Sequence, residues 1–193
     1  MAFERIARAP AHRNVTRKMI PAEFEKRKNK LEADIYVAFG QVALADGISL
    51  HQAVAIDDRK SSEEQKAVRG RDTYKRWQDI PDQDIRYCCS ALSFFDVKGF
   101  RFHLPAYMRL AVRDFPADPD DIRNSCEFHL TQEGGLSLRK SDPRRIVALY
   151  EFTSLQVQAI ASFLRFVSDY DDNLKTAPFL EAVTKWESIT IAG

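Results

Sequence analysis

Residues 90–115 read SALSFFDVKGFRFHLPAYMRLAVRDF, and no other stretch of the chain is so dense in aromatic and apolar residues. Its first part has the spacing of a buried helix. Asp96–Gly99 then predicts a turn, and apolar residues alternate with polar ones over residues 100–104 as in a half-buried strand. Pro105 suits the first turn of a following helix. The stretch therefore predicts a junction at which helices meet a small sheet.

Helical periodicity and capping boxes predict helices on both sides of this junction. They cover residues 23–45, 49–58, 61–77, 82–92, 105–115, 153–170 and 179–186, and Gly47 suits a left-handed residue after the first of them. Further strands are predicted at 126–131 and 146–152, with a hairpin turn at the glycine pair 134–135. For the second of these strands the alternative is a helix, which Asp142-Pro143 would start equally well. We expect an α+β fold that is mainly α, with six or seven helices around a small antiparallel sheet of three or four short strands.

Length and composition describe an ordinary globular protein. The 193 residues suffice for one domain with a packed core, and 45% are apolar and 30% charged. No apolar run approaches the ~20 residues that cross a bilayer, and the first residues lack a secretory apolar segment. The three cysteines have neither disulfide-framework nor zinc-site spacing. We therefore expect a cytoplasmic protein.

Charge is unevenly distributed, although the formal net charge is only +1. Residues 1–30 contain 9 Lys and Arg against 3 Asp and Glu, a net charge of +6, which leaves −5 for the remainder. We expect residues 1–22 to form a flexible basic arm and residues 23–193 a single globular domain. The arm lacks the interleaved aromatic residues of a base-stacking surface, so nucleic-acid binding is not favoured.

Four segments resemble DUF6714, a bacterial family of unknown function. They are Gly47–Asp58 (GISLHQAVAIDD), Trp77–Pro81 (WQDIP), Leu92–Met108 (LSFFDVKGFRFHLPAYM) and Leu155–Val167. The resemblance implies no activity, cofactor or catalytic residue, and it implies a tyrosine where this chain has His103. Many small bacterial proteins of this kind bind another protein, among them immunity proteins that neutralise toxins.

Four polar residues of the predicted strands would share one face of a sheet if those strands paired. They are Arg101, His103, Glu127 and His129. Such a cluster would be able to shuttle protons or hold an anion, which favours a small enzyme or a ligand-binding domain. The simpler interpretation is the outward face of a half-exposed sheet, since alternation alone produces it.

A second group of charged residues borders the opening stretch. It comprises Asp114, Asp118, Asp120 and Asp121, with Arg109 and Arg113 on the preceding helix. Acidic residues beside aromatic ones suit a basic partner, such as the catalytic groove of a nuclease toxin, although ordinary solubility also explains them.

Motifs for hydrolysis, phosphate binding and dinucleotide binding are absent from the sequence. His51 with Asp57 and Asp58 resembles a set of metal ligands, but no repeated ligand spacing supports a metal site. We therefore expect a non-catalytic protein-binding protein without metal or cofactor. Its most specific form is an immunity or inhibitor protein that masks the surface of a toxin.

Overall fold

The computed structural model describes residues 22–116, 121–131 and 143–191, and within these ranges the chain is helical and contains no strand. The α-helices are α1 (Ala22–Phe39), α2 (Leu50–Asp57), α3 (Ser62–Arg69), α4 (Asp82–Tyr87), α5 (Val97–Asp114), α6 (Asp121–Leu130), α7 (Pro143–Tyr150), α8 (Ser154–Tyr170) and α9 (Ala177–Glu187). Short 3-10 helices are η1 (Trp77–Asp79), η2 (Ala91–Phe94) and η3 (Asp172–Leu174). The prediction of an α+β fold with an antiparallel sheet is therefore wrong, and the fold is helical.

Helix α5 explains most of this error. The Asp96 side chain caps it by accepting a hydrogen bond from the Gly99 N–H at 2.7 Å. Every residue from Gly99 to Val112 except Arg101 is buried. Because buried residues lie on every side of the helix between Gly99 and Val112, the five residues 100–104 do not reveal one apolar helical face, and their alternation of apolar and polar residues also fits a strand. Its residues 100–104 consequently resembled a strand, and Pro105 lies inside the helix instead of opening it.

The other predicted strands are helices as well. Residues 126–130 belong to α6 and residues 146–150 to α7. In α6, Cys126 and Leu130 are buried one turn apart, while Phe128 between them is 40% exposed. The exposure of Phe128 fits a helix and not a strand, but the sequence, with apolar residues at 126, 128 and 130, fits strand alternation as well as the i, i+4 spacing of a helix. The predicted hairpin at residues 134–138 lies outside the described residues, and so do residues 1–21 of the predicted basic arm.

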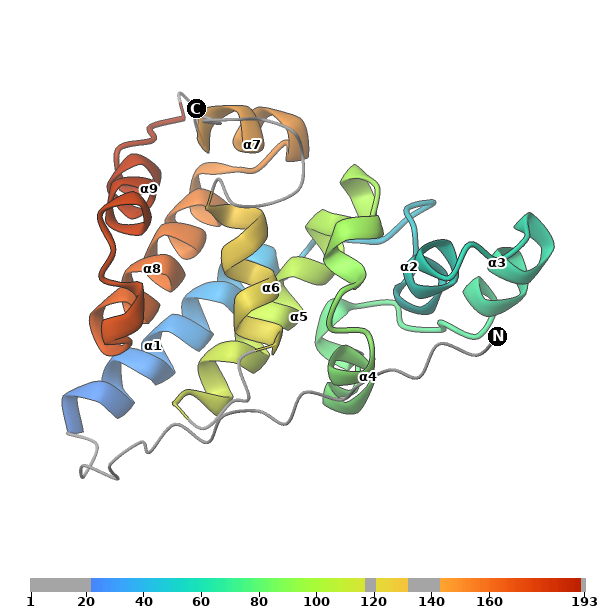
Figure 1. The fold of residues 1–193 in the computed structure, drawn as a ribbon, viewed down its shortest axis with the longest axis horizontal. Coiled ribbons are helices and arrows are strands. Elements are labelled where there is room, and N and C mark those ends of the chain that lie inside the picture. Colours follow the sequence, from blue (N-terminus) through green and yellow to red (C-terminus); the bar gives the residue numbers. More distant parts are fainter. Residues whose placement is uncertain (1–21, 117–120, 132–142, 192–193) are drawn as a thin grey trace, which may run out of the picture.

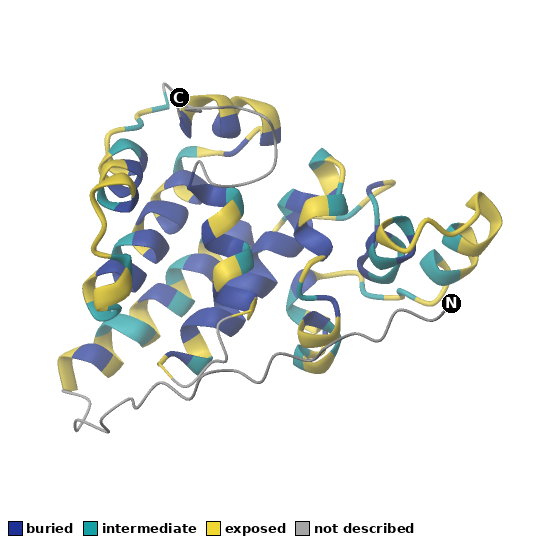
Figure 2. Cartoon of the chain, viewed as in Figure 1, coloured by how far each residue is buried: buried dark blue, intermediate teal, exposed yellow. Residues whose placement is uncertain are grey.

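The larger group of helices is layered around α1 and α8. Helix α1 packs between α5 and α8, and α8 packs between α1 and α9. Figure 1 shows α2, α3 and α4 to one side of this group, joined to it through α5. Buried residues concentrate along α5 and on the facing sides of α1 and α8 (Figure 2). One hydrophobic core extends through these elements from Phe24 to Trp186.

Two buried indoles tie separate segments to this core. Trp77 Nε1 donates to the Phe39 carbonyl at 2.9 Å, and Trp186 Nε1 donates to the Leu130 carbonyl at 2.7 Å. Each carbonyl is at the end of a helix, where it has no partner within the helix itself. The tryptophans therefore close the C-terminal ends of α1 and α6.

Gly47 has a different role from the one predicted. No described glycine has a positive φ, and the left-handed residue after α1 is Ala45, at φ 51°. A Cβ atom on Gly47 would lie 2.7 Å from the Gly99 nitrogen and 2.7 Å from Lys98 Cβ. Glycine is needed here because two backbone segments cross closely, at the start of α5.

None of the helices in the described ranges combines the length and apolar character needed to cross a bilayer.

Candidate functional site

The four polar residues expected on one sheet face do not form a cluster. Arg101 lines a hollow between α1, α5 and α8. Glu127 lines a hollow between α6 and α9, and His129 lines a separate one beside η2. His103 is only 1% exposed and lines none of these hollows. The prediction depended on a sheet that the described residues do not contain.

His103 is part of the core. Its Nδ1 lies 2.7 Å from the Gly99 carbonyl oxygen one turn earlier, and since a carbonyl only accepts, Nδ1 carries the proton. Burial lowers the pKa of His103 to about 4, against weaker raising effects of the Gly99 hydrogen bond and of the charges on Asp72 and Asp96. The imidazole is therefore neutral at neutral pH, and it serves packing.

The arginines and aspartates expected to face a partner are paired with each other. Asp82, at the start of α4, accepts hydrogen bonds from Arg109 at 2.8 Å and from Arg113 at 2.5 Å. Asp114 pairs with Arg86 and lies 3.5 Å from Arg113. These pairs hold α4 against the C-terminal half of α5. Most of these charges are therefore compensated by a partner within the protein. Of the remaining acidic residues, Asp121 is exposed at the start of α6, and Asp118 and Asp120 lie outside the described residues.

Two adjoining hollows lie along α6. The first, of about 420 Å³, separates α6 from η3 and α9, and the second, of about 310 Å³, separates α6 from η2 and the residues before it. Asn124 and Phe128 line both hollows. We refer to Asp121, Asn124, Ser125, Glu127 and Phe128 as the α6 surface. Within it Asp121, Asn124 and Phe128 are exposed, and Glu127 is buried at the wall of the first hollow.

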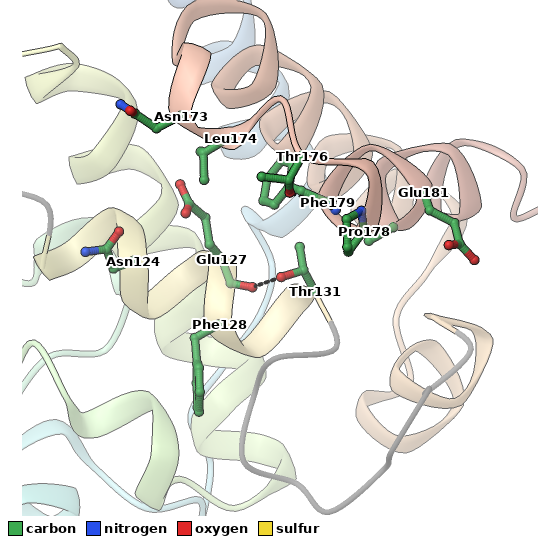
Figure 3. Close-up of a pocket in the computed structure, with 11 residues that line it drawn as sticks. Asn124, Glu127, Phe128, Thr131, Asn173, Leu174, Thr176, Pro178, Phe179 and Glu181 are labelled. Atoms are coloured by element: carbon green, nitrogen blue, oxygen red, sulfur yellow. Dashed lines mark hydrogen bonds between the residues drawn. The ribbon is translucent and has the colours of Figure 1, made fainter.

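The α6 surface combines an aromatic ring with acidic groups. Figure 3 shows the Glu127 carboxylate directed toward Leu174 in the first hollow, while the Phe128 ring points away from that hollow. Phe128 is 40% exposed, and the described residues that line the two hollows include Asp121, Glu127 and Glu181 but no lysine or arginine. Glu127 pairs with Arg123 and Glu181 with Lys185, so the exposed Asp121 beside Phe128 is the part of this face suited to a basic group with an apolar body.

A buried ion cluster fixes Glu127. Arg123 Nε lies 3.2 Å from Glu127 Oε1, and Arg123 Nη2 lies 3.1 Å from Asp171 Oδ2. The three side chains are 8–11% exposed, and the guanidinium carbon lies 5.6 Å from the Phe115 ring centroid. The cluster joins α6 to Asp171, the residue that follows α8. These charge-assisted contacts hold the Glu127 side chain in place beside the first hollow.

His51 has a carboxylate partner that the sequence did not reveal. Its Nδ1 lies 2.6 Å from Asp72 Oδ1, and its backbone N–H donates to Asp72 Oδ2 at 2.9 Å. The expected partners Asp57 and Asp58 do not take part. Since 21 residues separate His51 from Asp72, no local motif could have signalled the pair. Among the described residues, no three His, Cys, Asp or Glu side chains form a group that could hold a metal ion.

A family profile matches most of the chain. The profile of a family of unknown function, DUF6714, matches residues 27–189, which includes every element from within α1 to the end of α9. This chain belongs to the DUF6714 family. The resemblance predicted from the sequence segments is thus confirmed. No match was found among curated proteins or among solved structures.

In this DUF6714 protein, the segments that carried the resemblance form the junction of the fold. Gly47–Asp58 comprises the loop before α2 and α2 itself, and Leu92–Met108 comprises most of η2 and the first part of α5. The two segments cross at Gly47 and Gly99. The α6 surface lies outside all four segments, so the motifs specify packing and the candidate binding face is separate from them.

Proposed function

We propose that this protein is a non-catalytic protein-binding protein that uses the α6 surface to bind a basic partner. The observation that carries the proposal is the exposed Phe128 ring between two hollows whose described lining residues carry carboxylates and no lysine or arginine. Partly exposed aromatic residues flanked by depressions are typical anchors of protein interfaces. Acidic surroundings favour the approach of a basic partner and speed association.

The most specific form of the proposal is an inhibitor or immunity protein that neutralises a bacterial toxin by covering its basic catalytic groove. Inhibition of this kind is steric and electrostatic, and no bond is made or broken. A cytoplasmic location belongs to the same proposal. It is supported by the free thiols of Cys88, Cys89 and Cys126, since free cysteines are typical of a reducing compartment.

The alternative, a small enzyme built on Arg101, His103, Glu127 and His129, has less support because these residues face the core or separate hollows. A shared substrate would have to contact at least two of them at once.

The test is co-expression with the product of the neighbouring gene, followed by purification of the complex and measurement of its affinity. Phe128→Ala should weaken binding at least about tenfold, as expected for an interface anchor. Leu149→Ala is the matched control, because Leu149 is 42% exposed on α7 and lies outside the α6 surface. Equal losses in the two variants would show that α6 is not the binding face.

Charge is tested separately by Asp121→Lys, which reverses an exposed charge without disturbing the core. We expect slower association and a weaker dependence of the association rate on salt. Failure of the folded wild-type protein to retain any neighbour-encoded product would count against the inhibitor form of the proposal.

A further inference from the structure

A third hollow, remote in sequence from the α6 surface, has a mixed apolar and cationic lining. It measures about 580 Å³ and lies between the end of α1, the start of α5 and the start of α8. Val37 and Leu155 line it and are 73% and 55% exposed, which is unusual for large aliphatic side chains. The hollow thus offers an apolar surface that no described residue covers, within the size range of small-molecule sites.

Two cations, Lys98 and Arg101, stand at one side of this hollow. Arg101 is held only loosely, because its Nη1 is 3.6 Å from a Glu151 carboxylate that is itself 77% exposed. Its Nε is buried and donates to no described residue. Because the contact with Glu151 is long and that carboxylate is exposed, an anion in the hollow can compete for the guanidinium through a charge-assisted hydrogen bond.

The start of α8 supplies further donors to the same hollow. Gln156 lines it and is only 2% exposed. Its Oε1 accepts from the Thr153 N–H at 3.1 Å, which leaves the side-chain amide nitrogen without an acceptor among the described residues. The backbone N–H groups of Ser154 and Leu155 likewise have no acceptor there, at the positive end of a 17-residue helix.

We propose that this hollow binds a small amphiphilic carboxylate. The carboxylate head meets Arg101 and the donors at the start of α8, and the apolar body lies along Val37, Val42 and Leu155. The pairing follows from the lining, since apolar side chains on one side and unsatisfied donors on the other recognise the two ends of such a molecule. No residue of this hollow belongs to the α6 surface, so the proposal stands independently of protein binding.

The test is isothermal titration of the full chain with octanoate, compared with octanol and octylammonium. Octanoate should bind at least about tenfold more tightly than either, because only the carboxylate pairs with both Arg101 and the donors at the start of α8. Absence of any binding up to about 10 mM octanoate, or equal binding of octanol, would overturn the proposal.

Two variants with opposite expected effects locate the site. Arg101→Gln should weaken octanoate binding about tenfold or more, because it removes a charge-assisted hydrogen bond. Glu151→Gln should strengthen binding, because it removes the carboxylate that competes for Arg101. Arg165→Gln is the matched control, since Arg165 pairs with Glu187 away from the hollow and should leave affinity unchanged. Thermal unfolding of each variant verifies folding, and an unchanged affinity in both Arg101→Gln and Glu151→Gln would contradict the proposal.

Discussion

The His103 imidazole lies flat against the Phe95 ring, with the ring centroids 4.2 Å apart and an angle of 1° between the planes. The stack joins the middle of α5 to the residue that follows η2, and burial keeps the imidazole neutral. A histidine held in this way contributes to stability in a pH-dependent manner.

We predict that stability falls as the pH decreases from about 6.5 to about 4. Burial lowers the pKa of folded His103 to about 4, whereas the unfolded residue titrates near 6.5, so the unfolded chain binds the additional proton first. The stabilisation is complete above the unfolded pKa and is lost as the pH falls through the folded pKa, by up to about 3 kcal/mol. Urea unfolding of the wild type and of His103→Phe at several pH values in this range measures how the free energy of unfolding of each protein depends on pH. Parallel curves for the two proteins would show that His103 does not titrate as expected.

Gly47 and Gly99 should be intolerant of a methyl group, and Gly70 should tolerate one. A Cβ on Gly99 would lie 2.6 Å from the Ile48 carbonyl oxygen, and one on Gly47 would be 2.7 Å from the Gly99 nitrogen. At Gly70 the nearest atom would be 3.4 Å away, and its φ of −63° suits any residue. We expect Gly47→Ala and Gly99→Ala each to cost about 2 kcal/mol, and Gly70→Ala to be neutral or stabilising by about 0.5 kcal/mol.

Denaturant midpoints of these three variants are the measurement. A large loss of stability for Gly70→Ala, without one for Gly47→Ala and Gly99→Ala, would mean that the close crossing at Gly47 and Gly99 is not what requires glycine.

Asp72→Ala should destabilise the protein by about 1–3 kcal/mol, because it removes the acceptor of both the His51 backbone N–H and its Nδ1. The Asp72 side chain is only 3% exposed, so water cannot replace it freely. Asp57→Ala is the control, since Asp57 is exposed at the end of α2, where a negative charge is slightly unfavourable. Hydrogen exchange of α2 amides should report faster opening in Asp72→Ala only.

Arg123→Met should cost about 3–5 kcal/mol, because it leaves Glu127 and Asp171 buried without the guanidinium between them. Arg165→Met removes an ion pair whose side chains are 36% and 40% exposed, and it should cost less than about 1 kcal/mol. Chemical unfolding of both variants at neutral pH measures the loss of stability at each site. Similar costs at the two sites would indicate that the Arg123 cluster is solvated in solution.

Local signals in the sequence placed several helix starts correctly. The capping boxes at Ser49, Ser61 and Thr153 predicted the beginnings of α2, α3 and α8, and each helix begins at the next residue. These signals succeed because a capping box is satisfied within four consecutive residues. The predicted lengths were less accurate, as the helix expected to reach residue 77 ends at Arg69.

The candidate sites depended on contacts between distant residues, and there the sequence was a poor guide. Arg101 was predicted to share a sheet face with His129, but it lines a hollow together with Val37 and Gln156. Phe128 was not singled out, since one exposed aromatic residue in a short helix has no distinguishing pattern.

By itself the sequence determined the family, the helix caps and the identity of most core residues, because these depend on neighbouring residues and on apolar content. Tertiary structure decided whether residues 90–115 contain a strand. Enclosure of α5 by α1, α6 and α7 buries residues on every side of its middle part, His103 and Arg109 included, so the alternation over residues 100–104 does not reveal a helix. The same enclosure made His103 a core residue, and packing of the helices left hollows beside α6 and at the start of α8, where we propose that a partner and a ligand bind.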